Sequence, residues 1–149
     1  MMNGLLVAGL ILGVGAPAPK EAPKKGPAIP SIVGMWETQK YTAYGMDIPG
    51  KPMLFEFTAD GQFKMTKIKE AQTSQSRYKL DASKDPAELD WQMKGDEKTT
   101  LKGIYKIDGD TLTLCIEDGF DSKRPTKFES VKGTKTMMWT LKRVEKKKE

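Results

Sequence analysis

The residues best suited to chemistry in this sequence are two closely spaced pairs of carboxylates, Glu88 with Asp90 and Asp108 with Asp110. Paired carboxylates perform general acid–base catalysis, as in glycoside hydrolysis, where they face each other across a cleft at a defined separation. Nothing in the spacing here fixes such a separation. The sequence also contains no histidine, which excludes Ser/His/Asp and Cys/His nucleophile activation and most transition-metal sites. We therefore expect no catalytic residue, no metal and no cofactor, and a protein that is not an enzyme.

Large aromatic side chains offer a second kind of chemistry, the binding of an apolar molecule. Ligand pockets are lined mainly by apolar and aromatic groups with a few polar contacts. We expect the wall of such a site to contain Phe57, Trp91 and Tyr105, with Arg124 as a polar contact. The predicted partner is a small, largely apolar molecule.

These side chains must be positioned by β-strands, because no stretch shows sustained helical periodicity. Turn sequences such as Ala59-Asp60-Gly61 and Asp108-Gly109-Asp110 place residues that tolerate positive φ between β-type runs, as tight hairpins require. Consecutive hairpins predict an all-β fold, a single small antiparallel up-and-down β-barrel of about eight strands. The expected strands are Met35–Tyr44, Met53–Thr58, Gln62–Lys69, Gln75–Leu80, Leu89–Met93, Thr100–Ile107, Thr111–Ile116, Thr126–Ser130 and Met137–Val144.

The N-terminal part of the chain indicates export. The apolar run Leu5–Val14 is too short to span a bilayer as a helix and is typical of a signal peptide, which we place at 1–16; the alternative is a buried strand or helix of the core. Residues 17–30 hold five of the nine prolines and predict an extended linker. The domain would then span 31–144, followed by a basic tail at 145–149, in a protein of the periplasm, cell envelope or surroundings without a membrane span after cleavage.

The charge and the single cysteine place further limits on function. The net charge is +5, but lysines of the linker and tail account for it, and no aromatic residues alternate with them. We therefore expect no nucleic-acid partner. The lone Cys115 has no partner for a disulfide in the chain, and we expect it to be buried and inert.

Two sets of residues resemble known families. The triplet Gly34-Met35-Trp36, with Arg143 near the end of the last strand, resembles the Gly-x-Trp motif and closing arginine of lipocalin-like barrels. The resemblance implies that the indole plugs the closed end of the barrel and the guanidinium stacks on it, a cation–π contact of about 1–2 kcal/mol.

The second set is more specific. It is similar to a lipocalin-like domain family of unknown function found in planctomycete bacteria, over roughly residues 32–144. The resemblance implies a fold and an exported setting but no activity. Its elements are Pro86-Ala87-Glu88-Leu89-Asp90, the run from Lys102 to Cys115 with Gly103-Ile104-Tyr105 and Gly109-Asp110-Thr111-Leu112, and Arg124-Pro125-Thr126-Lys127-Phe128.

Several structural roles compete with the functional ones. Arg124 would either hold a loop to a carboxylate such as Asp90 or Glu117, or bind an anionic ligand at the barrel mouth. Gly103 within a strand would let a bulky neighbour or a bend fit.

Two hypotheses for function follow. In the first, the barrel holds a small apolar molecule in a cavity above roughly 300 Å3, and residues 45–52 act as a lid. In the second, the barrel is filled, and its surface serves as a structural or protein-interaction domain of the cell envelope.

Overall fold

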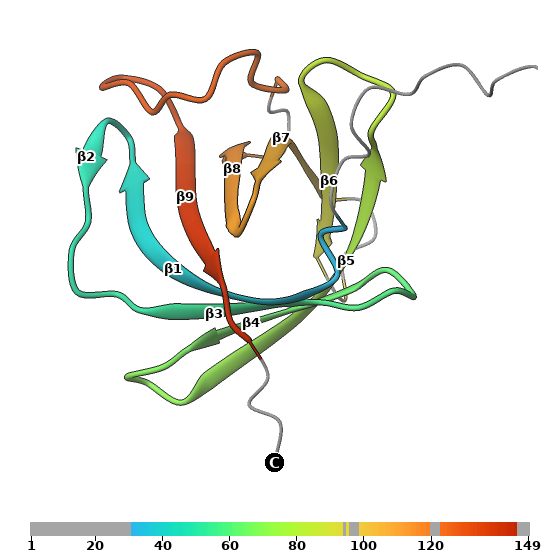
Figure 1. The fold of residues 1–149 in the computed structure, drawn as a ribbon. Coiled ribbons are helices and arrows are strands. Elements are labelled where there is room, and N and C mark those ends of the chain that lie inside the picture. The colour runs from blue at the N-terminus through green and yellow to red at the C-terminus, as the bar shows by residue number, and fades with distance from the viewer. Residues whose placement is uncertain (1–30, 94, 96–98, 120–122, 146–149) are drawn as a thin grey trace, which may run out of the picture.

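The computed structural model describes residues 31–93, 95, 99–119 and 123–145 (Figure 1). The signal peptide and linker expected at 1–16 and 17–30 lie outside these residues. Of the expected basic tail, only Glu145 is described.

Eight antiparallel strands form a closed barrel in sequence order, and the predicted fold class is confirmed. Strand β1 pairs with β3 on one side and with β9 on the other, which leaves no free edge in the ring. The short strand β2 pairs only with β1 and was not expected. The strands are β1 (Gly34–Ala43), β2 (Met46–Asp47), β3 (Met53–Phe57), β4 (Gln62–Lys67), β5 (Gln72–Asp81), β6 (Ala87–Met93), β7 (Thr100–Asp108), β8 (Thr111–Glu117) and β9 (Thr136–Arg143).

The hairpin turns lie where the sequence placed them. Gly61 precedes β4 with φ of +83°, and Gly109 joins β7 to β8 with φ of +59°. These backbone angles are costly for residues with a Cβ, so glycine fixes the point at which the chain reverses. The register of β7 and β8, with Asp108 opposite Thr111, follows from the second turn.

The expected strand Thr126–Ser130 is wrong. Strands β8 and β9 are already hydrogen-bonded neighbours along their whole length, so no edge is left for another strand between them. This segment instead covers the outer face of the barrel, where the Cys115 thiol donates to the carbonyl oxygen of Lys127 at 3.5 Å. Lys106 Nζ lies 4.7 Å from the centre of the Phe128 ring on the same face.

Cys115 is therefore fully buried, as expected, although it points away from the barrel interior. Burial is the main cause that raises the pKa of its thiol. A thiol that stays protonated and is covered by protein is a poor nucleophile.

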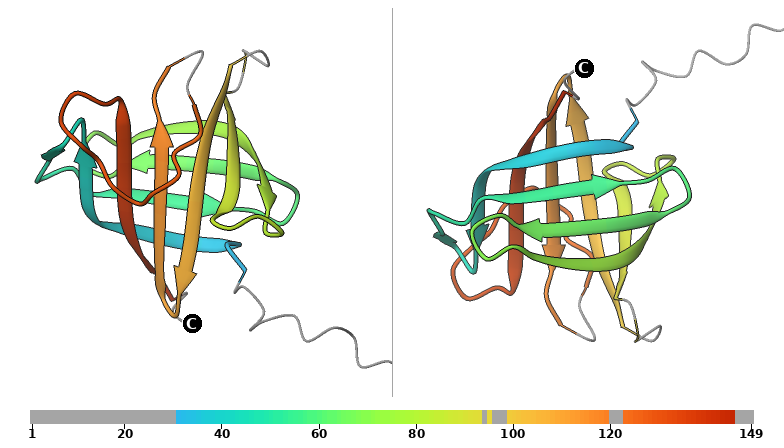
Figure 2. Two further views of the ribbon diagram at one scale, coloured as in Figure 1. Left: turned by 90° about the horizontal axis from the view of Figure 1, so that it is seen from above. Right: turned by 90° about the horizontal axis from the view of Figure 1, so that it is seen from below.

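Aromatic rings fill the centre of the barrel. Strands β3, β4 and β5 run across the direction of β7, β8 and β9 (Figure 2). The side chains between these two layers form the core. The Phe63 ring packs edge-on against the Trp91 ring at 4.4 Å between centres, and Phe55 lies 5.8 Å from Trp139. The largest fully buried side chains include Trp36, Phe55, Phe63, Leu89, Leu112, Leu114, Ile116 and Leu141.

The base of the barrel is closed by Trp36 and Arg143, as the resemblance to lipocalin-like barrels implied. Trp36 is fully buried, and its indole N–H donates to the Ile32 carbonyl at 2.8 Å. The Arg143 guanidinium carbon lies 4.1 Å from the indole centre. Its nitrogens donate to the carbonyls of Val33 at 3.1 Å and Ser31 at 2.8 Å. The arginine thus joins the last strand to the segment that precedes the first.

Glycines at two points allow close packing. A Cβ on Gly34 would lie 2.9 Å from the Arg143 guanidinium, so the Gly-x-Trp glycine makes room for the arginine. A Cβ on Gly103 would lie 2.7 Å from the Ile116 side chain and 2.8 Å from the Cys115 carbonyl oxygen. Gly103 therefore accommodates a bulky neighbour on β8, one of the two roles expected for it.

Candidate ligand-binding site

An irregularity in β1 lies beside the candidate site. Strand β1 pairs with β3 only up to Glu37, opposite Leu54, and a bulge at Gln39 then shifts its pairing with β9 by one residue. A bulge bends its strand and reverses which side chains face inward. Just before the bulge, where β1 no longer pairs with β3, the hydroxyl of Thr38 donates to the Met53 carbonyl at 3.2 Å.

The connection from β2 to β3 and the second half of β1 line a solvent-open cavity of about 520 Å3 on the side of the barrel. Its walls are residues 38–41 of β1, Asp47 of β2 and residues 48–52 of the connection. A backbone hydrogen bond from Ile48 N–H to the Tyr41 carbonyl, 2.9 Å long, attaches the connection to β1. This cavity is not the one expected inside the barrel, where packed aromatic side chains fill the space. Part of the segment expected to act as a lid forms one of its walls.

Tyr41 stands between this cavity and the aromatic core. Because of the bulge it shares the inward face with Trp139, its cross-strand partner, and the two rings stack at 5.0 Å between centres and 12° between planes. Burial is the main cause that raises the pKa of the Tyr41 phenol, with smaller contributions from Tyr44 and Asp118. Tyr41 therefore presents a neutral aromatic wall to the cavity at physiological pH.

The rim of the cavity is polar. Lys40 Nζ lies 3.6 Å from a carboxylate oxygen of Asp47, and both side chains are more than half exposed. Such a pair contributes at most about 1 kcal/mol, since water screens it. We therefore expect the apolar wall to provide most of the affinity for a ligand. This wall is made by Tyr41, Ile48 and the prolines of the connection.

The three expected wall residues belong to the packed core and do not line this cavity. Phe57, Trp91 and Tyr105 all face the barrel interior and are at most 6 % exposed. Phe57 stacks on Phe63 at 4.7 Å between ring centres, so ring contacts occupy its inner face. The sequence predicted the aromatic side chains of the barrel interior but not the cavity between β1 and the β2–β3 connection.

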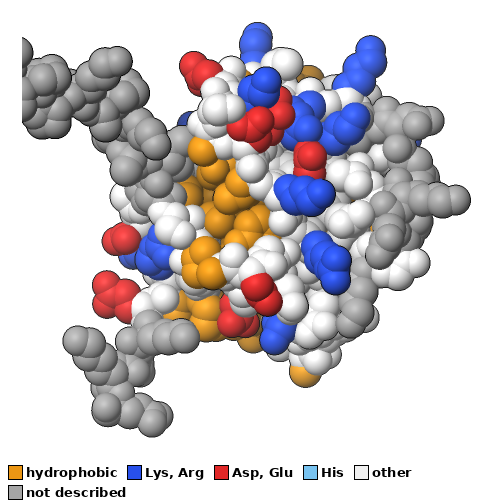
Figure 3. All heavy atoms as spheres, turned by 90° about the vertical axis from the view of Figure 1, so that its right-hand side faces the viewer, with side chains coloured by type: hydrophobic (Ala, Val, Ile, Leu, Met, Phe, Trp, Pro, Cys, Tyr) orange, Lys and Arg blue, Asp and Glu red, His pale blue; other side chains and the backbone are white. Residues whose placement is uncertain are grey.

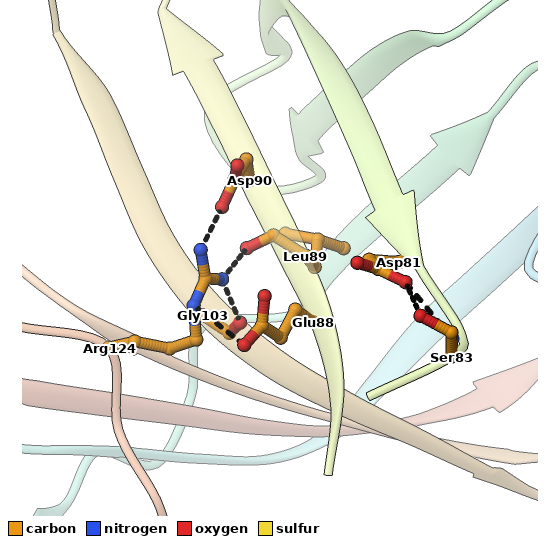
Figure 4. A network of polar contacts seen from close by, with 7 residues as sticks. All are labelled: Asp81, Ser83, Glu88, Leu89, Asp90, Gly103 and Arg124. Atoms are coloured by element: carbon orange, nitrogen blue, oxygen red, sulfur yellow. Dashed lines mark hydrogen bonds and ion pairs between the residues drawn. The ribbon is translucent and has the colours of Figure 1, made fainter. Parts of the chain in front are cut away.

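Arg124 lies on the outer face of the barrel beside Glu88 and Asp90 (Figure 4) and does not line the cavity. One Nη donates to Asp90 Oδ1 at 2.6 Å, and the other donates to the backbone carbonyls of Gly103 at 2.7 Å and Leu89 at 3.3 Å. Nε lies 3.5 Å from Glu88 Oε1. The expected contact of Arg124 with Asp90 is present, and Arg124 does not line the cavity beside Tyr41. Glu88 and Asp90 lie on this outer face beside the arginine.

A second cavity, of about 250 Å3, lies between β4, β5 and β6. It is below the range typical of ligand pockets. Its walls include polar side chains such as Ser76, Arg77 and Gln92. The larger cavity is therefore the better candidate for a ligand site.

The functional residues missed by sequence reasoning are those of β1. Strict alternation from Trp36 places Lys40 inward and Tyr41 outward, whereas the bulge at Gln39 reverses this order. The available signal was the Gly- and Pro-containing connection at 45–52, which the sequence did single out.

Comparisons with protein-family models, curated proteins and solved structures gave no match for this chain. Within the part of the chain that the structure describes, no helix is long and apolar enough to cross a membrane.

Proposed function

We propose that this chain is an exported, non-catalytic binding module of lipocalin-like type that holds a small, largely apolar molecule. The observation that carries the proposal is the 520 Å3 cavity beside Tyr41. Support for export comes from the signal-like run Leu5–Val14 and the proline-rich stretch that follows it. The family resemblance in Gly103-Ile104-Tyr105 and the neighbouring motifs supports the same setting.

The cavity suits such a molecule in size and lining. Its volume lies within the roughly 300–1,000 Å3 typical of small-molecule sites. Ile48 is half-buried in the connection and Tyr41 is half-buried in β1, so a ligand between them would remove the remaining apolar surface of both from water. This burial provides the driving force for binding.

Tryptophan emission titrated with octanol and with octanoate tests the proposal. We expect a saturable change, because the Trp139 ring lies directly behind Tyr41. Ile48→Ser should weaken binding about fivefold, as expected from losing roughly 1 kcal/mol of apolar contact. Ile68→Ser is the matched control, because Ile68 is exposed and does not line the cavity. Its affinity should equal that of the unaltered protein.

The rival function, a structural or interaction domain, gains support from one surface. The face shown in Figure 3 carries an apolar patch bordered by charged side chains. Apolar surface of this kind marks protein contacts when it is large enough. A flat tryptophan titration with both probes, in the unaltered protein and in both variants, would favour this rival over the binding module.

A further inference from the structure

The outer face of β4, β5 and β6 carries an arginine without a counter-charge. Arg77 in β5 is exposed, and no side chain of the described residues forms an ion pair or hydrogen bond with its guanidinium. Asp90 lies two residues from Gln92, the partner of Arg77 on β6, but it is bonded to Arg124 at 2.6 Å. The charge of Arg77 is therefore available to a molecule from outside the chain.

The strand register places an amide directly beside this arginine. Gln62 of β4 lies opposite Arg77, and both point outward because their neighbours Phe63 and Ser76 are buried. Side chains directly opposite each other on neighbouring strands have Cβ atoms about 4.5–5.5 Å apart. The Gln62 side chain also has no hydrogen-bond partner among the described residues. A guanidinium and a side-chain amide thus lie side by side.

Both groups line the solvent-open cavity of about 250 Å3 between β4, β5 and β6. Gln92, opposite Arg77 on β6, forms another part of its wall. Among the described residues of this wall, Arg77 carries the only charge. Because β5 is paired with β4 on one side and with β6 on the other, the backbone that carries these side chains is held in place.

The lining determines which molecules suit this cavity. The planar fork of a guanidinium matches a carboxylate or a phosphate, with which it forms two parallel hydrogen bonds. A glutamine amide offers two donors and an acceptor, which suits the hydroxyl groups of a ligand. A volume below the range of drug-sized pockets selects a small molecule. The cavity therefore suits a small, hydroxylated molecule with a negative charge.

We propose that this cavity is a second binding site, for an anionic oxygen group on a small hydroxylated molecule such as a sugar acid or a sugar phosphate. Arg77 pairs with the anionic group, and Gln62 bonds a neighbouring hydroxyl. The site shares no lining residue with the cavity beside Tyr41. The inference therefore goes beyond the proposed function and does not depend on it.

Glucose, glucuronate and glucose 6-phosphate make a matched series of probes, because they share the sugar ring and differ at carbon 6. In low-salt buffer, we expect glucuronate or glucose 6-phosphate to bind at least tenfold more tightly than glucose, as a charge-assisted hydrogen bond provides. The tighter of the two shows whether the site prefers a carboxylate or a phosphate. Backbone amide shifts in the nitrogen-labelled protein should include Gln62 and Arg77, and octanol should not displace the sugar.

Arg77→Gln removes the guanidinium and should abolish the preference for the anionic sugars over glucose. Arg77→Lys keeps the charge but loses the planar fork, so about a third of that preference should remain. Lys79→Gln is the matched control, because Lys79 is an exposed cation on the same face of β5 that does not line the cavity. Its affinities should stay within about twofold of those of the unaltered protein.

Three results would overturn this inference: equal affinity for all three sugars, no binding of any of them, or equal losses in Arg77→Gln and Lys79→Gln. None of these results bears on the octanol site beside Tyr41. Conversely, a protein that binds the anionic sugars but not octanol would support this second site and refute the proposed one. Titration of the unaltered protein decides between these results even if a variant fails to fold.

Discussion

Replacing Trp36 with alanine should lower the free energy of unfolding by about 3–5 kcal/mol, as expected for truncating a fully buried tryptophan. The loss includes the indole hydrogen bond to Ile32 and the surface on which Arg143 stacks. Because these contacts join the beginning of the barrel to its end, their loss affects closure as well as local packing. Chemical denaturation followed by circular dichroism measures the change without relying on the altered tryptophan.

Arg143→Lys separates the contribution of the planar guanidinium group to stability from that of its positive charge. Lysine keeps the positive charge but loses the planar stacking and the paired bonds to the Val33 and Ser31 carbonyls. We expect a loss of about 1–2 kcal/mol. Arg77→Lys, on an exposed arginine of β5, is the matched control and should change stability by less than about 0.5 kcal/mol. Equal stability of the two lysine variants would contradict the closure described here.

Arg124→Met should release the segment that covers Cys115. The arginine side chain is 22 % exposed and holds this segment to β6 and β7 through Asp90 and two backbone carbonyls. Charge-assisted hydrogen bonds of this kind contribute roughly 1.5–3 kcal/mol. The rate at which a maleimide labels Cys115 in the absence of denaturant should rise about 10- to 100-fold, because labelling follows the local opening equilibrium.

Lys127→Met provides the control for this experiment. It removes one positive charge from the same segment, but the Lys127 side chain is exposed, whereas its backbone carbonyl lies against Cys115. Labelling should stay at the rate of the unaltered protein. If maleimide labels Cys115 no faster in Arg124→Met than in Lys127→Met, Arg124 does not hold the covering segment in place.

The strands and the closure of the barrel could be predicted because local chemistry determines them. Glycines at positive φ fix the hairpin turns, and alternation of apolar residues such as Leu112 and Leu114 fixes the inward face. The Gly34, Trp36 and Arg143 set fixes how the first and last strands meet. Each of these signals lies in a short stretch of sequence.

The candidate site escaped prediction because its determinants are not local. The bulge at Gln39 arises where β1 stops pairing with β3 and continues to pair with β9. A glutamine at this position does not by itself predict a bulge. The outer position of residues 126–130 depends on β8 and β9 already being paired. The sequence correctly predicted that Arg124 contacts Asp90. It did not predict that the pair lies on the outer face of the barrel, because the strand register determines that face.

The most direct test of the binding site is a map of backbone amide shifts in the nitrogen-labelled protein during titration with octanol. Saturable shifts should concentrate in residues 38–41 and 47–52, which line the cavity. The β7–β8 hairpin at Gly109, close to the closed base, should remain unshifted. Shifts confined to other parts of the barrel, or none at the highest octanol concentration, would contradict a ligand site between β1 and this connection.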